Sequence, residues 1–312
     1  MKKIEVIGLQ SVPEIKQGDD LATIIVRCAK DEIGGLIEKD IIVLTSKIVS
    51  KAARLTRRLG EVRPGRKALF ISRKTGKDAK WLQMIFDAGH QILAIMSLKG
   101  FFKQHILSAT EDAGCGQQLV EHEKAICMTI NKDGRIHTCD AGIDGSNHPD
   151  DMVSLLPVDP DKVAREIREQ IQRLIDRKVA VVLADTEMIP FGTMDLAVGS
   201  SGIQPRAKMF GKKDLFNKPK FGGIDLIAHE LTATSALVFG QVNAGIPVAV
   251  IRGYEYEINE TENISNTLLP KSDRASLSEV IKATMQATSY AYGLKERLLL
   301  KIASWFINWF IK

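Results

Sequence analysis

Residues 139–147 read Cys-Asp-Ala-Gly-Ile-Asp-Gly-Ser-Asn, which places two carboxylates, two glycines, a hydroxyl and an amide within nine positions. A second acidic sequence, Ala184-Asp185-Thr186, follows the apolar run 179–183. Carboxylates beside a polar glycine turn are a common way to hold hard cations and phosphates. Asp-Gly and Ser-Asn pairs are also ordinary in surface turns, so these residues alone leave a ligand loop and a plain turn both open.

The composition of the 312-residue chain is typical of a globular protein in water, with 45% apolar and 26% charged residues. The net charge of +5 requires no nucleic-acid partner and suits a phosphate-bearing small molecule. Cys28, Cys115, Cys127 and Cys139 show no C-x-x-C spacing and no histidine at metal-ligand spacing, which argues against a zinc site and a disulfide framework. The first residues lack the apolar segment of a signal peptide, so we expect a cytoplasmic location.

The first half of the chain predicts short strands and helices in alternation. Strands are expected over residues 4–9, 41–44 and 67–71, and a helix over 80–90. Another helix is expected after Asp19 or Asp20, either of which can cap it. Residues 126–130 and 136–139 predict a hairpin that is closed by the turn Asp133-Gly134.

The second half of the chain predicts a similar alternation. A helix is expected from Asp161, because its apolar residues recur at helical spacing. The run 179–183 predicts a central strand with Asp185 and Thr186 at its carboxyl end, where open α/β sheets bind ligands. The following expectations are a glycine-rich turn near 195–199, a basic loop over 206–220, a helix reaching about 238 and a buried strand over 246–251.

Residues 45–51, Thr-Ser-Lys-Ile-Val-Ser-Lys, place two lysines four positions apart where a strand gives way to a loop or a helix. Such a place can hold phosphate oxygens. A solvated helix face is the simpler interpretation of the same residues.

Together these segments resemble one family, the coenzyme F420-0:L-glutamate ligases, which are γ-glutamyl ligases. The family's elements are V-x-T-S-K-V-V-S-K, N-A-G-[IV]-D-x-S-N, S-D-T, D-[VI]-A-[IV]-G, D-E-[LI]-A and a glycine-rich finish that ends in R-G. Residues 43–51, 140–147, 184–186, 195–199, 229–232 and 240–253 match them in the same order. The resemblance implies a mixed α/β fold of the α+β type, with two interlocking lobes whose central sheets are flanked by helices.

The resemblance covers about residues 1–255, which we expect to form a γ-glutamyl ligase-like domain. A helical extension over 256–294 and an amphipathic tail helix over 295–312 are expected to follow. The tail carries Trp305, Phe306, Trp309 and Phe310, and it is shorter than the about 20 residues that span a bilayer. Peripheral contact with a membrane surface and docking on the protein body or in a dimer interface are both compatible with it.

The resemblance also implies an activity. GTP would be bound with Mn²⁺ or Mg²⁺, with K⁺ as a further ion, and the carboxylate of a small-molecule acceptor would be phosphorylated to an acyl phosphate. The amine of L-glutamate would then displace phosphate and form an amide, a reaction that needs positioned cations more than a nucleophilic side chain. The family forms homodimers, and no nucleic-acid partner is implied.

Site roles are implied position by position. Asp144 and Asp185 would be the catalytic carboxylates and would hold one metal ion, while Thr186 and Gln241 would hold a second. Thr186 as a helix cap and Gln241 as an exposed turn residue are the simpler alternatives. The residues implied to bind the nucleotide are Leu9, Gln10, Ser11, Val12, Ser46, Lys47, Lys51, Asn147, Phe239, Gly240, Val242, Asn243, Ala244, Gly245 and Ile246.

The chain departs from the family pattern at several positions. The family carries G-R-x-W-R after S-D-T, whereas residues 187–193 read Glu-Met-Ile-Pro-Phe-Gly-Thr and contain no arginine. Arginine is the preferred residue for bidentate phosphate contacts. Because these arginines are missing, two acceptors stay open: F420-0, and a different compound such as a folate-type γ-glutamyl acceptor. Asp140 stands where the family has Asn and is expected to add a negative charge near the metals, and His229 replaces an Asp. A non-catalytic nucleotide-binding or membrane-associated module is the alternative to an enzyme.

Overall fold

The computed structural model describes residues 3–98, 124–149, 151–189, 192–207, 209, 211–221, 224–268, 293, 298–299 and 302. The chain divides into two compact units, Met1–Thr267 and Leu268–Lys312, and the elements given below belong to the first. Most of the expected extension and the tail lie outside the described residues. Among the residues that are described, no helix combines the length and the apolar character needed to cross a membrane.

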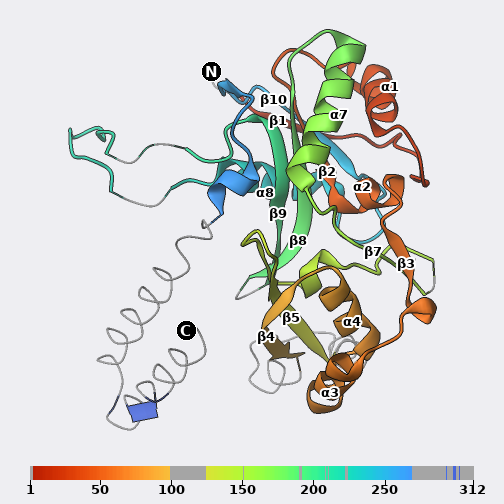
Figure 1. Ribbon diagram of the computed structural model, residues 1–312. Helices are drawn as coiled ribbons and strands as arrows, with labels where there is room; N and C mark the ends of the chain where they lie inside the picture. Colours follow the sequence, from red (N-terminus) through yellow and green to blue (C-terminus); the bar gives the residue numbers. More distant parts are fainter. Residues whose placement is uncertain are drawn as a thin grey trace, which may run out of the picture. The chain divides into compact units, whose positions relative to one another are not determined.

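A six-stranded sheet in the order β1-β10-β2-β8-β9-β11 forms the centre of the first unit (Figure 1). Strands β2 and β8 run parallel, and each of the other neighbouring pairs is antiparallel. The mixed α/β fold that the sequence predicts is therefore confirmed. The strands are β1 (Glu5–Gly8), β10 (Val248–Arg252), β2 (Ile41–Thr45), β8 (Ala180–Ile189), β9 (Gly192–Ile203) and β11 (Ile258–Asn259).

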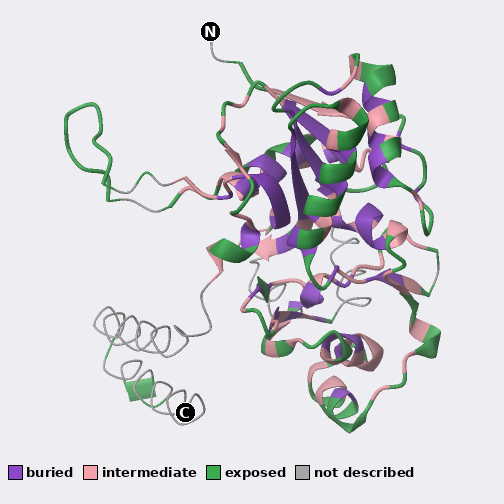
Figure 2. Ribbon diagram, turned by 45° about the horizontal axis from the view of Figure 1, so that its top comes forward, coloured by how far each residue is buried: buried purple, intermediate pink, exposed green. Residues whose placement is uncertain are grey.

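Helices cover both faces of this sheet, because its central strands are apolar on both sides. Ile42 and Leu44 of β2 pack in one buried cluster with helices α1 and α7, and Ile41 and Val43 pack in another with helix α8. Figure 2 shows the buried strands between these layers. The helices are α1 (Leu21–Ile33), α2 (Ser46–Ala52), α7 (Pro160–Ile175) and α8 (Ile227–Phe239).

A smaller lobe is inserted between β2 and β8 in the chain. Its three-stranded sheet has the order β4-β5-β6, and it shares a buried cluster with helices α3 and α4 that includes Ala68, Leu82, Ile85 and Cys127. A two-stranded ribbon, β3 with β7, runs beside it. The elements are β3 (Thr56–Arg58), α3 (Arg66–Thr75), α4 (Ala79–Asp87), β4 (Gln91–Ser97), β5 (Ala125–Ile130), β6 (Ile136–His137) and β7 (Met152–Ser154), with 3-10 turns at Leu59–Glu61 and Asp140–Gly142. A third 3-10 turn, Ile264–Thr267, follows β11 outside this lobe.

Most of the expected elements are confirmed. Asp20 caps α1 by accepting from the N–H of Thr23. The expected hairpin also forms, and the turn Asp133-Gly134 joins its strands β5 and β6. The strand expected over 67–71 is wrong, because these residues lie in helix α3, which ends where Gly76 adopts a left-handed φ of 79°. A short apolar run does not distinguish a strand from a buried helical turn, and this one was misassigned for that reason.

Strand β8 is longer than predicted. Its pairing with β9 continues from Val181 to Ile189, so Asp185 and Thr186 lie within the strand and not at its carboxyl end. The expected glycine-rich turn near 195–199 is wrong as well, since those residues belong to β9. Gly199 is required there by close packing, because a Cβ atom would lie 2.5 Å from the carbonyl carbon of Pro160.

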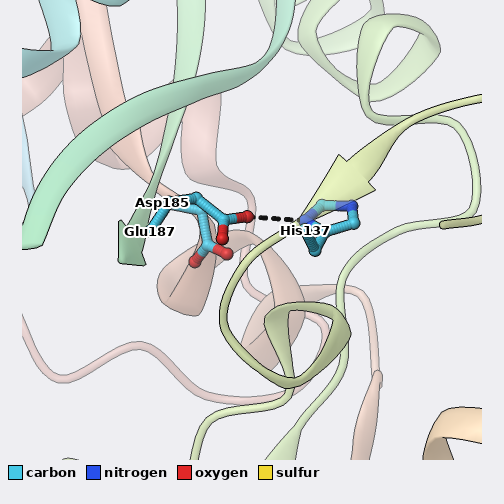
Figure 3. Close-up of side chains that lie close together, drawn as sticks. All are labelled: His137, Asp185 and Glu187. Carbon is cyan, nitrogen blue, oxygen red and sulfur yellow. Dashed lines mark hydrogen bonds and ion pairs between the residues drawn. The ribbon is translucent and has the colours of Figure 1, made fainter. Parts of the chain in front are cut away.

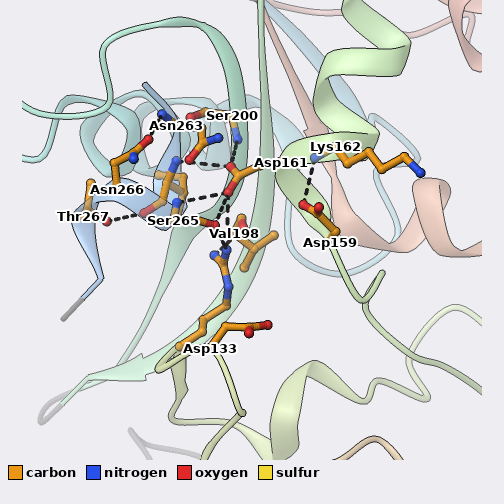
Figure 4. A network of polar contacts seen from close by, with 12 residues as sticks. Asp133, Asp159, Asp161, Lys162, Val198, Ser200, Asn263, Ser265, Asn266 and Thr267 are labelled. Carbon is orange, nitrogen blue, oxygen red and sulfur yellow. Dashed lines mark hydrogen bonds and ion pairs between the residues drawn. The ribbon is translucent and has the colours of Figure 1, made fainter. Parts of the chain in front are cut away.

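Asp161 joins three separate segments at the start of α7 (Figure 4). Its buried carboxylate accepts from the N–H groups of Ser200, Ile264 and Ser265 at 2.8, 3.1 and 3.0 Å. Arg135, from the hairpin of the smaller lobe, lies 3.6 Å from the same carboxylate. The ion pair of Arg135 and Asp161 therefore links the smaller lobe to β9 and to the 3-10 turn at Ile264–Thr267.

Replacing Asp161 is expected to destabilise the fold far more than replacing its neighbour Asp159. Asp161→Ala leaves three N–H groups without their acceptor and removes the ion pair of the buried Arg135, which should lower the free energy of unfolding by about 3–5 kcal/mol. Asp159→Ala removes only a helix cap, the bond from the N–H of Lys162, and should cost about 1 kcal/mol. Urea unfolding of both variants measures the difference, and equal losses would contradict this role for Asp161.

Candidate functional site

Asp185 lies where the parallel strands β2 and β8 run side by side. Thr45, the last residue of β2, pairs with Ala184, so helix α2 begins directly beside Asp185. The hydroxyl of Ser46 donates to Asp185 Oδ1 at 2.6 Å. The other oxygen, Oδ2, is buried and has no hydrogen-bond partner among the described residues. An unsatisfied buried carboxylate oxygen is costly, so this atom requires an explanation.

The stretch 139–147 bends sharply over Asp185. Asp140, Ala141 and Gly142 have left-handed φ angles of 49°, 61° and 70° in succession. Only glycine fits the third position, because a Cβ atom on Gly142 would lie 2.2 Å from a methyl carbon of Leu156 and 3.0 Å from Asp185 Oδ2. The glycine thus permits close approach of this loop to the carboxylate.

Asp140 does not leave an uncompensated charge in the site, contrary to the expectation from its position in the motif. It is buried, its Oδ1 accepts from the N–H of Cys127 at 2.9 Å, and its Oδ2 lies 2.6 Å from Nζ of the buried Lys77. The Lys77 ammonium also lies 5.0 Å from the ring centre of Trp81. The aspartate is therefore neutralised within the smaller lobe, where it anchors the bend.

Asp144 is half-buried at the far end of the same loop. Lys47 Nζ lies 2.7 Å from its Oδ2, and the N–H of Ser146 donates to its Oδ1 at 2.6 Å. Burial alone would raise the pKa of Asp144, but Lys47 and Ser146 outweigh burial and hold the pKa below its ordinary value. Asp144 is accordingly ionised at neutral pH.

Helix α2 and the turn after α8 both contact the loop. Lys47 Nζ donates to the carbonyl of Ser146 at 2.7 Å, and Lys51 Nζ donates to the carbonyl of Asn147 at 3.0 Å. The amide of Asn147 donates to the carbonyl of Val242 at 3.1 Å. Three segments that are far apart in sequence therefore converge around residues 144–147.

Thr186 and Gln241 converge on a residue that the sequence interpretation did not assign. The Thr186 hydroxyl donates to Asp195 Oδ1 at 2.7 Å, and Gln241 Nε2 lies 3.3 Å from both carboxylate oxygens of Asp195. Thr186 does not cap a helix, since it lies within β8. Asp195 belongs to the D-[VI]-A-[IV]-G element, and this membership was the signal that could have identified it.

The remaining residues expected at the nucleotide lie on two turns. Leu9 is buried and pairs through its N–H with the carbonyl of Val248, which brings residues 9–12 beside the segment that leads into β10. The N–H groups of Gln10 and Ser11 both donate to Glu32 at 2.8 Å. Of the second turn, Phe239 is buried, residues 241–245 are exposed, and Ile246 is half-buried. No described contact joins Leu9, Gln10, Ser11 or Val12 to Asp185.

Like charges surround Asp185. Burial raises the pKa of this carboxyl well above its ordinary value, and the charges of Glu187, Asp144 and Asp195 raise it further, while the hydrogen bond from Ser46 opposes them. A carboxylate in such surroundings gains strongly from a nearby cation. The donor set of carboxylates, a hydroxyl and an amide is the one that hard divalent ions prefer.

His137 and Glu187 also lie beside Asp185 (Figure 3), and the sequence interpretation missed both. One donor atom from each of these three residues lies within 4.8 Å of the other two, although no histidine stands at metal-ligand spacing along the sequence. The two-residue period of a strand would have aligned Glu187 with Asp185 if β8 had been predicted to continue. Spacing gave no signal for His137.

Burial raises the pKa of the adjacent Cys139 thiol to about 12, so this thiol stays protonated.

Carboxylates gather beside two lysines where β2 ends and β8 continues, and this combination of groups is typical of proteins that bind metal ions and phosphate groups together. Within this class, residues 10–253 match the family model described as F420-0:Gamma-glutamyl ligase, and the chain belongs to that family.

Several similar proteins bear the name coenzyme F420:L-glutamate ligase. The protein from Methanosarcina acetivorans is 32% identical over 86% of this chain and 93% of its own length. The protein from Methanothermobacter thermautotrophicus is 31% identical over 81% of this chain and 90% of its own length. The protein from Methanococcus maripaludis is 32% identical over 80% of this chain and 88% of its own length.

The buried pair of Lys77 and Asp140 is expected to be necessary for a stable smaller lobe. Lys77→Met leaves the Asp140 carboxylate buried without its cation and should lower the free energy of unfolding by about 3–5 kcal/mol. The double variant Lys77→Met with Asp140→Asn removes both charges and should recover most of this loss. Denaturant unfolding measures both, and a double variant as unstable as the single one would contradict the pairing.

Proposed function

We propose that this protein is a nucleotide-dependent γ-glutamyl ligase that joins L-glutamate to the carboxylate of a small-molecule acceptor. GTP is the proposed nucleotide, and an acyl phosphate is the proposed intermediate. The observation that carries the proposal is the buried Oδ2 of Asp185, which lacks a partner among the described residues and lies among other carboxylates. Membership of the F420-0:Gamma-glutamyl ligase family supports the same reaction class.

The residues present fit a divalent metal ion. Asp185 offers an unsatisfied oxygen, and Asp144 is ionised nearby, so these two carboxylates are proposed to hold one ion. Thr186 and Gln241 are proposed to hold a second, positioned by Asp195. Mn²⁺ or Mg²⁺ bound there supplies positive charge to the oxygens of the transferring phosphoryl group.

The side chains of α2 are proposed to bind the phosphates. Lys47 and Lys51 lie one helical turn apart and both extend to the 144–147 loop, where Lys47 pairs with Asp144 and Lys51 with Glu14. Phosphate oxygens are proposed to replace these carboxylates as partners of the two ammonium groups. Asn147 holds this loop against the 241–245 turn, so the nucleotide is proposed to bind beside these two segments. These residues orient the γ-phosphate toward the acceptor carboxylate, whose oxygen attacks phosphorus while GDP leaves. The glutamate amine then attacks the acyl carbon, and inorganic phosphate leaves as the amide forms.

The acceptor is proposed to bind near the β8–β9 hairpin. The paired residues there are Glu187 with Met194, Met188 with Thr193 and Ile189 with Gly192, and no arginine occurs in this stretch. Arginine gives phosphate its bidentate contacts, so we propose an acceptor with a carboxylate but no phosphodiester, such as a folate-type γ-glutamyl acceptor.

Nucleotide binding is expected to require both the metal ion and Asp185. Calorimetric titration of the protein with GTP should show binding in the presence of Mn²⁺ and none after chelation. Asp185→Asn should weaken binding at least about tenfold, because a metal ligand is lost. The same variant should raise the free energy of unfolding of the metal-free protein by about 1 kcal/mol, since a buried charge is removed from among like charges.

Asp159→Asn is the matched control for this experiment, because asparagine caps helices as well as aspartate and residue 159 lies at the start of α7. It should leave GTP binding unchanged. The absence of binding of either GTP or ATP by the wild-type protein, at every metal concentration tried, would refute the proposed function.

Acceptor choice is expected to favour compounds that lack a phosphodiester. Mass spectrometry after incubation with GTP, Mn²⁺ and L-glutamate should detect a glutamyl adduct of a folate-type acceptor in preference to F420-0. Restoring an arginine through Thr193→Arg should shift the preference toward F420-0, with Thr261→Arg, at an exposed position outside the hairpin, as the comparison. A preference for F420-0 in the wild-type protein would contradict this acceptor and leave the ligase proposal intact.

A further inference from the structure

An imidazole lies beside the carboxylates of Asp185 and Glu187 (Figure 3). His137 comes from β6 in the smaller lobe, while Asp185 and Glu187 are two residues apart on β8 of the central sheet. His137 and Glu187 are 3% and 4% exposed, so their polar atoms have little access to water. Buried polar groups at the junction of two lobes need partners, and these residues face one another.

Glu187 is held so that one oxygen is committed to the backbone and the other is turned to the cluster. Its Oε2 accepts from the N–H groups of Thr138 and Cys139 at 2.6 and 3.1 Å, and from the Thr138 hydroxyl at 2.8 Å. Its Oε1 lies 2.7 Å from His137 Nδ1. Such outer contacts are typical of carboxylates that are oriented for metal binding.

The spacing of these atoms suits a shared cation. Two neighbouring ligands of an ion at about 2.1 Å are separated by about 3 Å, which is close to the distance between His137 Nδ1 and Glu187 Oε1. The donor atoms of all three residues lie within 4.8 Å of one another. The buried Oδ2 of Asp185, which also carries the proposed function, has no hydrogen-bond partner among the described residues and is therefore open to a ligand.

We propose that His137, Glu187 and Asp185 form a binding site for a divalent transition-metal ion with mixed nitrogen and oxygen ligands. The ion takes the place of the proton on Nδ1 of His137. This proton passes to solvent while Nε2 takes one up, so the imidazole binds as its neutral Nε2–H tautomer. The inference shares Asp185 with the proposed ligase site but adds ligands that the ligase assignment does not use. It does not require GTP.

The imidazole determines which ions the site prefers. Sites built from oxygen alone favour Mg²⁺, Ca²⁺ and Mn²⁺, whereas imidazole nitrogen favours Zn²⁺, Co²⁺ and Ni²⁺. The wild-type protein should therefore bind Co²⁺ without nucleotide, and the visible absorption of Co²⁺ reports its coordination geometry and changes when a ligand is replaced. Mg²⁺ in large excess should displace it poorly.

The test is a Co²⁺ titration of the metal-free full-length protein, followed by calorimetry and visible absorption. His137→Asn should weaken Co²⁺ binding at least about tenfold and change the absorption bands. The asparagine amide can still donate to Glu187, which preserves the hydrogen bond while the imidazole is lost. Glu187→Gln should weaken binding to a similar extent, because its amide oxygen can still accept from the N–H groups of Thr138 and Cys139.

His229→Asn is the matched control, since His229 is a half-buried histidine whose Nδ1 accepts from the N–H of Ala197. It should leave Co²⁺ binding unchanged. Failure of the wild-type protein to bind Co²⁺ would overturn the inference, as would unaltered affinity in folded His137→Asn or Glu187→Gln. Co²⁺ binding without any binding of GTP would support the metal site and refute the ligase proposal, so the two failures are distinguishable.

Discussion

The unsatisfied Oδ2 atom of Asp185 is the constraint on which the rest of the site depends. Burial and neighbouring carboxylates both disfavour the charged form of Asp185, and they raise its pKa well above the ordinary value. Evolution of a stable fold alone would favour an apolar or amide side chain there. The proposed cation would account for an aspartate at this position.

The fold makes this concentration of charge possible by anchoring each charged segment elsewhere. Asp140 is neutralised by Lys77 within the smaller lobe, and Asp161 collects three N–H groups at the start of α7. Close packing at Gly142 holds the bend against the carboxylate. The loop with Asp144 is thus fixed from both sides, and Lys47 and Lys51 of α2 fix its far end. The site is therefore supported by rigid elements of both lobes.

The sequence predicts the main layers well, because β1, β2, α1, α7, α8 and β10 have clear apolar periods and Asp20 caps α1. It does not predict that β8 continues past Asp185, since the continuation depends on pairing with β9. Ordered motifs identified Asp144, Asp185, Thr186 and Gln241 as a group. Lys77, His137 and Glu187 escaped notice because their partners are 50 or more residues away in sequence. Tertiary contacts at such separations leave no local periodicity.

The most direct test of the account is an anomalous diffraction experiment on crystals grown with Mn²⁺ and GTP, with data collected at the manganese edge. The account predicts a manganese peak about 2.2 Å from Asp185 Oδ2, in contact with Asp144 as well. A map with no peak beside Asp185, in crystals where GTP is bound, would contradict the claim that this buried carboxylate is there to hold a metal ion.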